Sequence, residues 1–179
     1  MCCNADIVNV RISKRLSLYL RHQPEKIGLR LDKAGWADVE DILSALHITR
    51  AELDEVVATN DKQRFAFNDD GSKIRASQGH SIPVELELPR QTPPAVLYHG
   101  TVATFLDAIM REGLRPMNRQ HVHLSATVGT ARKVGARRGT PVILTVDAAA
   151  MDAAGAPFWL SANGVWLTDH VPPEYLRQD

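Results

Sequence analysis

Cysteine is nearly absent from this 179-residue sequence. Its only two cysteines, Cys2 and Cys3, are adjacent. Neighbouring cysteines close no stabilising loop, which excludes a disulfide-held scaffold and favours a reducing compartment. No apolar run approaches the roughly 18 residues that a membrane-spanning helix needs. A basic segment followed by an apolar one, as in a secretory signal peptide, is also missing at the start. We therefore expect a cytoplasmic protein with no membrane partner.

The sequence has no excess of charge of either sign. Lys and Arg total 21 and Asp and Glu total 21, so the formal net charge is zero. Attraction to nucleic acid must therefore come from local patches rather than from bulk charge. Basic residues gather in two blocks, 11–30 and 111–138, and an acidic block lies at 32–55. Such runs are most often solvated helix faces, but two basic blocks are also suited to a shared anionic ligand.

Motifs of several common enzyme classes are absent as well. The sequence has neither a P-loop nor a Gly-x-Gly-x-x-Gly turn, so ordinary ATP and Rossmann sites are unsupported. No Gly-x-Ser-x-Gly elbow occurs, and the few carboxylates of the second half form no glycosidase-like pair. A hydrophobic content of 44% and a charged content of 23% are ordinary for a globular protein of one domain or two small lobes.

The first half reads as short helices followed by a hairpin. Ile12, Leu16 and Leu20 recur every four residues and predict a helix that ends near His22. Asp38 is typical of an N-cap, and it precedes the apolar helical pattern of residues 39–46.

A second helix start is marked by Thr49 and Glu52, which have the spacing of a capping box. Residues 64–67 and 73–76 then flank an Asp-Gly turn, which predicts a β-hairpin. Helices closed by a hairpin indicate a winged-helix-like lobe over residues 1–76, a fold that often meets nucleic acid.

Residues 77–94 contain four of the ten prolines and predict a linker to a second lobe at 95–179. In this lobe we expect strands at 96–99, 121–124, 141–146 and in a hairpin over 158–168. Helices are expected before Gly113, with Phe105, Leu106, Ile109 and Met110 turned inward, and at 128–134. The whole chain is thus predicted to be α+β, with a mixed or antiparallel sheet in the second lobe.

Three arginines and a histidine stand at element ends or on loops, namely Arg21, His22, Arg64 and Arg119. Each alone is ordinary, since cations are common at helix ends and on exposed strands. Together they are the residue types of a phosphate site, because a guanidinium offers paired donors to oxyanions. His121 and His123 lie two apart on an expected strand and therefore share a face, which also suits a metal. With no further ligand at short range, we expect no metal.

Six short strings together identify the chain as similar to the RNA 2′-phosphotransferases, called KptA in bacteria. In order they are LRH at 20–22, NDKQRF at 60–65, RASQGHS at 75–81, LYHGT at 97–101, MNRQHVHLS at 117–125 and NGVWL at 163–167. The resemblance implies an N-terminal winged-helix RNA lobe and a C-terminal ADP-ribosyltransferase-like lobe that binds NAD⁺. It also implies removal of an internal RNA 2′-phosphate in two steps. The phosphate first displaces nicotinamide from NAD⁺, and the ADP-ribose 2″-hydroxyl then attacks phosphorus. This yields 2′-OH RNA and ADP-ribose 1″,2″-cyclic phosphate.

The resemblance also implies site residues. The family's Arg-His-Arg-Arg catalytic set falls on Arg21, His22, Arg64 and Arg119. Its NAD⁺ site falls on these positions: His99, Gly100, Thr101, His123, Leu124, Ser125 and Val165. The apolar Val165 stands where related transferases often have a glutamate. Arg137 is a candidate for the pyrophosphate, and the sequence does not choose between it and Arg138.

Two other functions stay open at the level of sequence. One is an ADP-ribosyltransferase that modifies phosphate ends of nucleic acid or a protein and never completes the second step. The other is a winged-helix nucleic-acid binder without enzymatic activity, for which the histidine strings of the second lobe would have no task. The expected partners are NAD⁺ and an RNA with an internal 2′-phosphate, and we expect a monomer.

Overall fold

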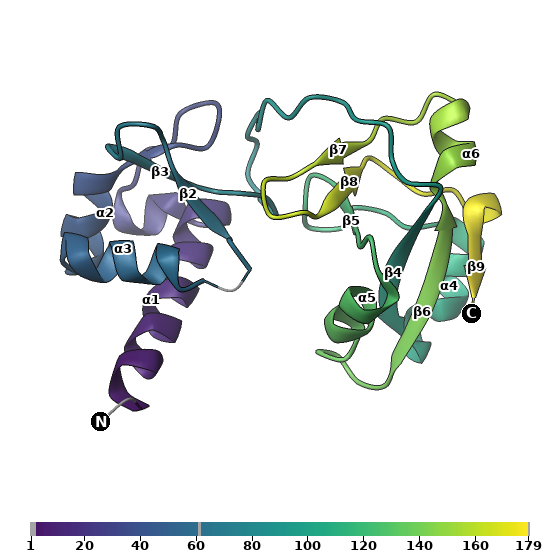
Figure 1. The fold of residues 1–179 in the computed structure, drawn as a ribbon, viewed down its shortest axis with the longest axis horizontal. Helices are drawn as coiled ribbons and strands as arrows, with labels where there is room; N and C mark the ends of the chain where they lie inside the picture. Colours follow the sequence, from purple (N-terminus) through teal and green to yellow (C-terminus); the bar gives the residue numbers. More distant parts are fainter. Residues whose placement is uncertain (1–2, 61, 179) are drawn as a thin grey trace. The chain divides into compact units, whose positions relative to one another are not determined.

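The computed structural model describes residues 3–60 and 62–178, with side chains from Ile7 onward; Cys2 and Asp61 lie outside them. The chain divides into two compact units, Met1–Glu87 and Leu88–Asp179 (Figure 1). Each unit is described by itself. The division falls within residues 77–94. No helix among the described residues is long and apolar enough to cross a membrane.

The first unit packs helices against a small antiparallel sheet. Its helices are α1 (Cys3–Arg21), η1 (Pro24–Ile27), α2 (Val39–Leu46) and α3 (Arg50–Ala58). Its strands are β1 (Ala37–Asp38), β2 (Phe65–Phe67) and β3 (Lys73–Ala76), in the order β1-β3-β2. Leu16 and Leu20 on α1 are fully buried against Ile42, Leu53 and Ile74. The apolar spacing of α1 and the β2–β3 hairpin are therefore both confirmed.

The two expected helix caps have different outcomes. Thr49 and Glu52 form the complete capping box: the Glu52 amide donates to Thr49 Oγ1 at 3.3 Å and the Thr49 amide donates to Glu52 Oε2 at 2.7 Å. Asp38 does occupy the N-cap position of α2, but its side chain makes no capping hydrogen bond. The predicted N-cap position is therefore confirmed, and the same residue also belongs to β1, where its backbone pairs with Lys73.

Residues 77–87, expected from sequence to be part of a linker, pack onto the first unit. Ser77, His80, Val84 and Leu86 are buried. The amide of Ser77 donates to the Arg64 carbonyl at 2.8 Å, and that of Ser81 to the Arg21 carbonyl at 2.9 Å. This segment therefore lies beside the end of α1 and the start of β2.

The second unit contains two three-stranded antiparallel sheets, β4-β6-β9 and β5-β8-β7. The strands are β4 (Val96–Val102), β5 (Val122–Leu124), β6 (Pro141–Asp147), β7 (Trp159–Leu160), β8 (Trp166–Thr168) and β9 (Leu176–Gln178). The helices are α4 (Ala103–Glu112), α5 (Val128–Gly135), α6 (Ala148–Ala153) and η2 (Pro173–Tyr175). Leu97, Leu144, Phe158 and Leu167 form the centre of the core. The α+β class is confirmed, and every strand pair among the described residues is antiparallel.

Helix α4 is less buried than its sequence predicts. Leu106 and Ile109 pack against the core, but Phe105 is 43% exposed and Met110 is 36% exposed. The prediction that all four face inward is wrong for Phe105 and Met110, because α4 buries only a narrow stripe against the unit.

Helix α6 was not predicted from the sequence. Its first turn is capped by Asp147, whose Oδ1 accepts a hydrogen bond from the Ala150 amide at 3.1 Å.

Helix α5 packs directly onto the backbone of β4 at a pair of glycines. A Cβ on Gly100 would overlap the carbonyl oxygen of Ala131, and one on Gly135 would lie 3.0 Å from the Thr101 carbonyl oxygen. Two glycines thus allow the helix and the strand to approach more closely than any other residue type permits.

Gly100→Ala is therefore expected to destabilise the second unit by at least about 1–3 kcal/mol, since backbone rather than a flexible side chain must move. Gly129→Ala on the same helix meets nothing within 4 Å. Its stability should be unchanged or raised by up to about 1 kcal/mol. Urea denaturation of both variants is the measurement, and equal stability of the two would contradict the packing argument.

Candidate functional site

Strands β4 and β5 bring two of the expected histidines together in the second unit. A β-bridge joins the strands: the Tyr98 amide donates to the Ser125 carbonyl at 2.9 Å and the Ser125 amide returns a bond of 2.8 Å. Beside this bridge, His99 Nδ1 lies 3.2 Å from the carbonyl oxygen of His123. Because a carbonyl only accepts, the proton of His99 is on Nδ1.

His99 is held in its neutral form. Burial lowers its pKa most, and the positive charges of Arg119 and Arg138 lower it further, against the hydrogen bond to His123. A neutral ring with its proton on Nδ1 leaves the Nε2 lone pair as an acceptor. His99 can therefore accept a hydrogen bond from a ligand without adding charge to the site.

Arg119 lies against His123 and is surrounded by other cations. Its Nη1 donates to His123 Nδ1 at 3.1 Å, so the neutral His123 ring carries its proton on Nε2. Partial burial lowers the pKa of Arg119, and the charges of Arg138 and Arg137 lower it further. Positive charges within electrostatic reach of one another are a general sign of an anion site.

Arg137 and Arg138 follow the end of α5. The charge of Arg138 acts on both His99 and Arg119, whereas that of Arg137 acts on Arg119. The Arg138 guanidinium also lies 5.8 Å from the centre of the Phe105 ring, which gives the exposed Phe105 a cation to contact. Both arginines therefore add positive charge to the same cationic cluster around Arg119.

The other expected residues of the second unit lie on the same strands or next to them. Thr101 is buried near the end of β4, and Ser125 directly follows β5. Leu124 is 1% exposed and belongs to the core. Val165 lies before β8, and the pairing of Leu124 with Trp166 brings it to the same end of β5 as Ser125.

The first unit brings together the three remaining candidates. Arg21 ends α1, His22 follows it, and Arg64 directly precedes β2. Arg21 Nη2 donates to the Arg64 carbonyl at 3.5 Å. The Arg64 guanidinium donates in turn to Asn60 Oδ1 at 3.3 Å, which orients it. The candidate set is thus divided, with these three in the first unit and Arg119 in the second.

Ser81 contacts His22, a pairing that sequence reasoning did not find. His22 Nδ1 lies 2.9 Å from Ser81 Oγ, and Ser81 Oγ donates to the Arg21 carbonyl at 3.5 Å. The hydroxyl proton is thereby used, so His22 Nδ1 donates to Ser81. Ser81 lies within the RASQGHS string, but 59 residues separate it from His22, and only the fold brings them together.

His80 is buried directly behind these groups and was also not predicted. It is 1% exposed, and neither ring nitrogen has a hydrogen-bond partner among the described residues. Burial, helped by the positive charges of Arg21, His22 and Arg75, lowers its pKa to about 4. A neutral imidazole therefore lies beside the arginine of the candidate site without adding a charge.

His121 and His123 have different neighbours despite their shared spacing. The His121 ring packs edge-on to Trp159, with ring centres 5.0 Å apart, and burial lowers its pKa. His123 contacts Arg119 instead. Within residues 3–60 and 62–178 no group of three His, Cys, Asp or Glu side chains has the geometry of a metal site.

Guanidinium groups beside neutral imidazoles in each unit define a protein suited to binding phosphate esters. Comparison with known proteins gives the family: a family model described as RNA 2'-phosphotransferase, Tpt1 / KptA family, matches residues 8–170. The chain belongs to this family.

Curated relatives are similar over nearly the whole chain. A protein of Streptomyces coelicolor is 60% identical over 173 residues, which covers 94% of each chain. One of Flavobacterium johnsoniae is 57% identical, covering 93% of this chain and 94% of the relative. One of Trichormus variabilis is 54% identical, covering 94% and 95%. Each carries the name "Probable RNA 2'-phosphotransferase".

The depressed pKa of His80 predicts loss of stability in mild acid. In the unfolded chain this imidazole titrates near 6.5, and in the folded chain at about 4. Between these values the unfolded state binds more protons, so stability is complete above about pH 6.5 and is lost as the pH falls toward 4. The full loss amounts to roughly 3 kcal/mol.

The measurement is urea denaturation at pH 7 and at pH 5, compared with His80→Phe, which fills the same space with a ring that does not titrate. The variant should lose less stability than the wild type between the two pH values. The same loss in both proteins would show that the acid sensitivity arises elsewhere, for instance at His99 or His121, whose pKa values are also lowered.

Proposed function

We propose that this chain is an NAD⁺-dependent RNA 2′-phosphotransferase. The reaction moves an internal RNA 2′-phosphate to NAD⁺ and gives 2′-OH RNA, nicotinamide and ADP-ribose 1″,2″-cyclic phosphate. Family membership and the names of the relatives support the phosphotransfer. The observation that carries the proposal is the contact of Arg119 with His123, 3.1 Å long, inside a cluster of three guanidinium groups.

The proposal assigns a different substrate to each unit. Residues 1–76 act as a winged-helix-like RNA lobe and residues 95–179 as an ADP-ribosyltransferase-like lobe for NAD⁺. Residues 77–94 connect the two, and the first part of this connection, residues 77–87, packs onto the first unit. Three helices and a β-hairpin in the first unit, and the strands that bear His99 and His123 in the second, support this assignment.

In the first unit, Arg21 and Arg64 are proposed to donate to oxygens of the RNA 2′-phosphate. His22 is proposed to give a proton to the departing RNA 2′-oxygen, or else to orient the phosphate. The bond of its Nδ1 to Ser81 orients the ring for this task. Arg119 of the second unit is proposed to stabilise the charge that develops on phosphate oxygens during the reaction.

The cationic cluster of the second unit fits NAD⁺. Arg137 or Arg138 would pair with its pyrophosphate, and the neutral His99 would accept a hydrogen bond from a sugar hydroxyl through Nε2. Gly100, Thr101, His123, Leu124, Ser125 and Val165 complete the proposed site. NAD⁺ supplies an electrophilic ribose carbon with a good leaving group. A phosphate monoester is mostly dianionic near neutral pH, so no carboxylate is needed to deprotonate it, which agrees with Val165 at its position.

The direct test incubates the purified, metal-free protein with a short RNA that bears one internal 2′-phosphate, with and without NAD⁺. Mass spectrometry should show NAD⁺-dependent loss of the phosphate and formation of ADP-ribose cyclic phosphate. A persistent ADP-ribose adduct would instead support an ADP-ribosyltransferase that stops after one step. Absence of NAD⁺ binding would favour a nucleic-acid binder without this activity.

Removal of a phosphate-binding arginine should abolish most of the activity. Arg64→Ala and Arg119→Ala are each expected to lower kcat/KM at least about a hundredfold, since each would remove a donor to the charged transition state. Arg111→Ala is the matched control, because Arg111 is exposed and its side chain pairs, among the described residues, with Glu112. Near-normal activity of either test variant would exclude that arginine from the site.

Loss of the hydroxyl beside His22 should slow the reaction without preventing binding. Ser81→Ala is expected to lower kcat about tenfold or more, because the imidazole loses the group that fixes its orientation. Ser81→Thr keeps the hydroxyl and should restore most of the rate. Nitrogen NMR of His22 would show whether its tautomer changes in Ser81→Ala, and an unchanged spectrum with an unchanged rate would refute the role.

A further inference from the structure

A groove between α1 and α3 in the first unit is lined by polar and charged side chains, among them Arg64, and by the apolar Val10 and Val56. Its volume is about 550 Å³, within the range of about 300–1,000 Å³ common for small-ligand sites. One wall comes from α1 and includes Asn9, Ser13, Lys14 and Ser17, and the other comes from α3 and the turn that follows it.

The wall formed by α1 is polar because of a four-residue spacing. Asn9, Ser13 and Ser17 follow one another at this interval and so share a helix face, and Arg21 follows at the same interval. Asn60 connects this helix face to the proposed active site through hydrogen bonds. Its Nδ2 donates to Ser13 Oγ at 3.1 Å, and its Oδ1 accepts from the Arg64 guanidinium at 3.3 Å.

The groove contains side chains of both charges. Lys14 and Arg64 are cationic, whereas Glu55 holds Asn9 by a hydrogen bond of 3.0 Å from Asn9 Nδ2 to its carboxylate. Cations suit a backbone phosphate, while a carboxylate and side-chain amides suit the amino groups of a base or a ribose hydroxyl. This combination fits a nucleotide better than it fits an isolated anion.

We propose that this groove binds the nucleotide that neighbours the 2′-phosphorylated ribose in the RNA strand. Lys14 contacts the backbone phosphate between the two nucleotides, and the Asn9–Glu55 pair contacts base or sugar. The inference rests on the proposed function, because Arg64, which lines the groove, is one of the residues assigned to the 2′-phosphate.

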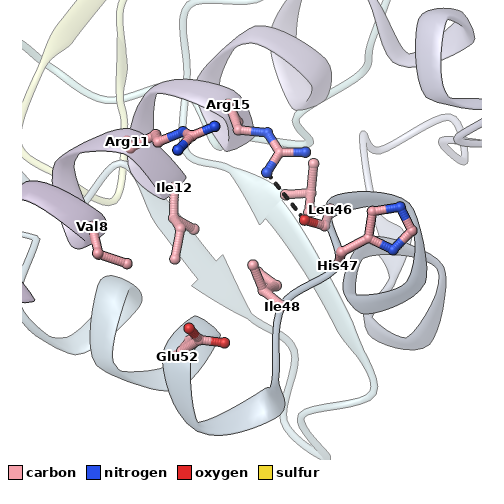
Figure 2. A pocket seen from close by; sticks show the side chains of 8 residues that line it. All are labelled: Val8, Arg11, Ile12, Arg15, Leu46, His47, Ile48 and Glu52. Carbon is pink, nitrogen blue, oxygen red and sulfur yellow. Dashed lines mark hydrogen bonds between the residues drawn. The ribbon is translucent and has the colours of Figure 1, made fainter.

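A second pocket in the first unit provides the control. It lies between α1, the end of α2 and the start of α3, has a volume of about 570 Å³, and includes Arg11 and Arg15 (Figure 2). Its floor is apolar, with Ile12, Leu46 and Ile48, and Arg15 donates to the Leu46 carbonyl at 3.0 Å. None of the residues proposed for catalysis lines it. Arg11 is therefore a cation of the same helix that lies outside the groove.

The experiment measures RNA affinity by fluorescence anisotropy across a salt series. The probe is a labelled oligonucleotide with one internal 2′-phosphate and flanking nucleotides on both sides. Lys14→Ala should weaken binding about threefold or more and reduce the slope of log affinity against log salt by about one, as expected for one lost phosphate contact. Lys14→Glu should weaken binding further. Arg11→Ala should bind as the wild type does, and circular dichroism verifies that all variants fold.

Shortened probes locate the contact. Removal of the flanking nucleotides from one side should bring wild type and Lys14→Ala to equal affinity, and removal from the other side should not. The groove is refuted if Arg11→Ala weakens binding as much as Lys14→Ala, if no shortening removes the difference, or if the wild type binds no RNA. Binding is measured without NAD⁺, so a wild type that binds RNA but transfers no phosphate would refute the proposed function and leave the groove supported.

Discussion

Both candidate sites depend on histidine rings that stay uncharged beside guanidinium groups. In the second unit, His99 and His123 lie next to Arg119, and in the first, His80 lies behind Arg21. A protonated ring at any of these positions would add one more positive charge beside the arginines. Burial keeps His80 and His99 uncharged, so the arginines can gather where an anion is to bind.

The same constraint gives each ring a defined direction. His99 uses Nδ1 on the His123 carbonyl, and His123 uses Nδ1 as an acceptor for Arg119. The β-bridge between Tyr98 and Ser125 sets the distance between His99 and His123. Backbone pairing of two strands therefore decides the tautomers of both rings, and through them which atoms a ligand meets.

Local signals in the sequence predicted the elements but not the contacts between them. The Thr49–Glu52 box and the Asp-Gly hairpin depend on neighbouring residues and were predicted correctly. Asp38 occupies its predicted N-cap position, whereas Phe105 is more exposed than predicted because of the position of α4. Arg21, His22 and Arg64 were recognised from their strings, whereas Ser81 and His80 depend on how residues 77–87 pack. No periodicity encodes a contact across 59 residues.

Glycine decides where the cations of the second unit lie. Gly100 and Gly135 let α5 touch the backbone of β4, and Arg137 and Arg138 follow the end of that helix. A bulkier residue at Gly100 would move α5 away from the strand that bears His99. Since electrostatic interaction falls with distance, such a shift would weaken the effect of Arg138 on His99 and Arg119 together. Gly100 therefore has a structural reason to stand beside His99 whether or not it contacts a ligand, and the cationic cluster depends on close backbone packing as much as on its arginines.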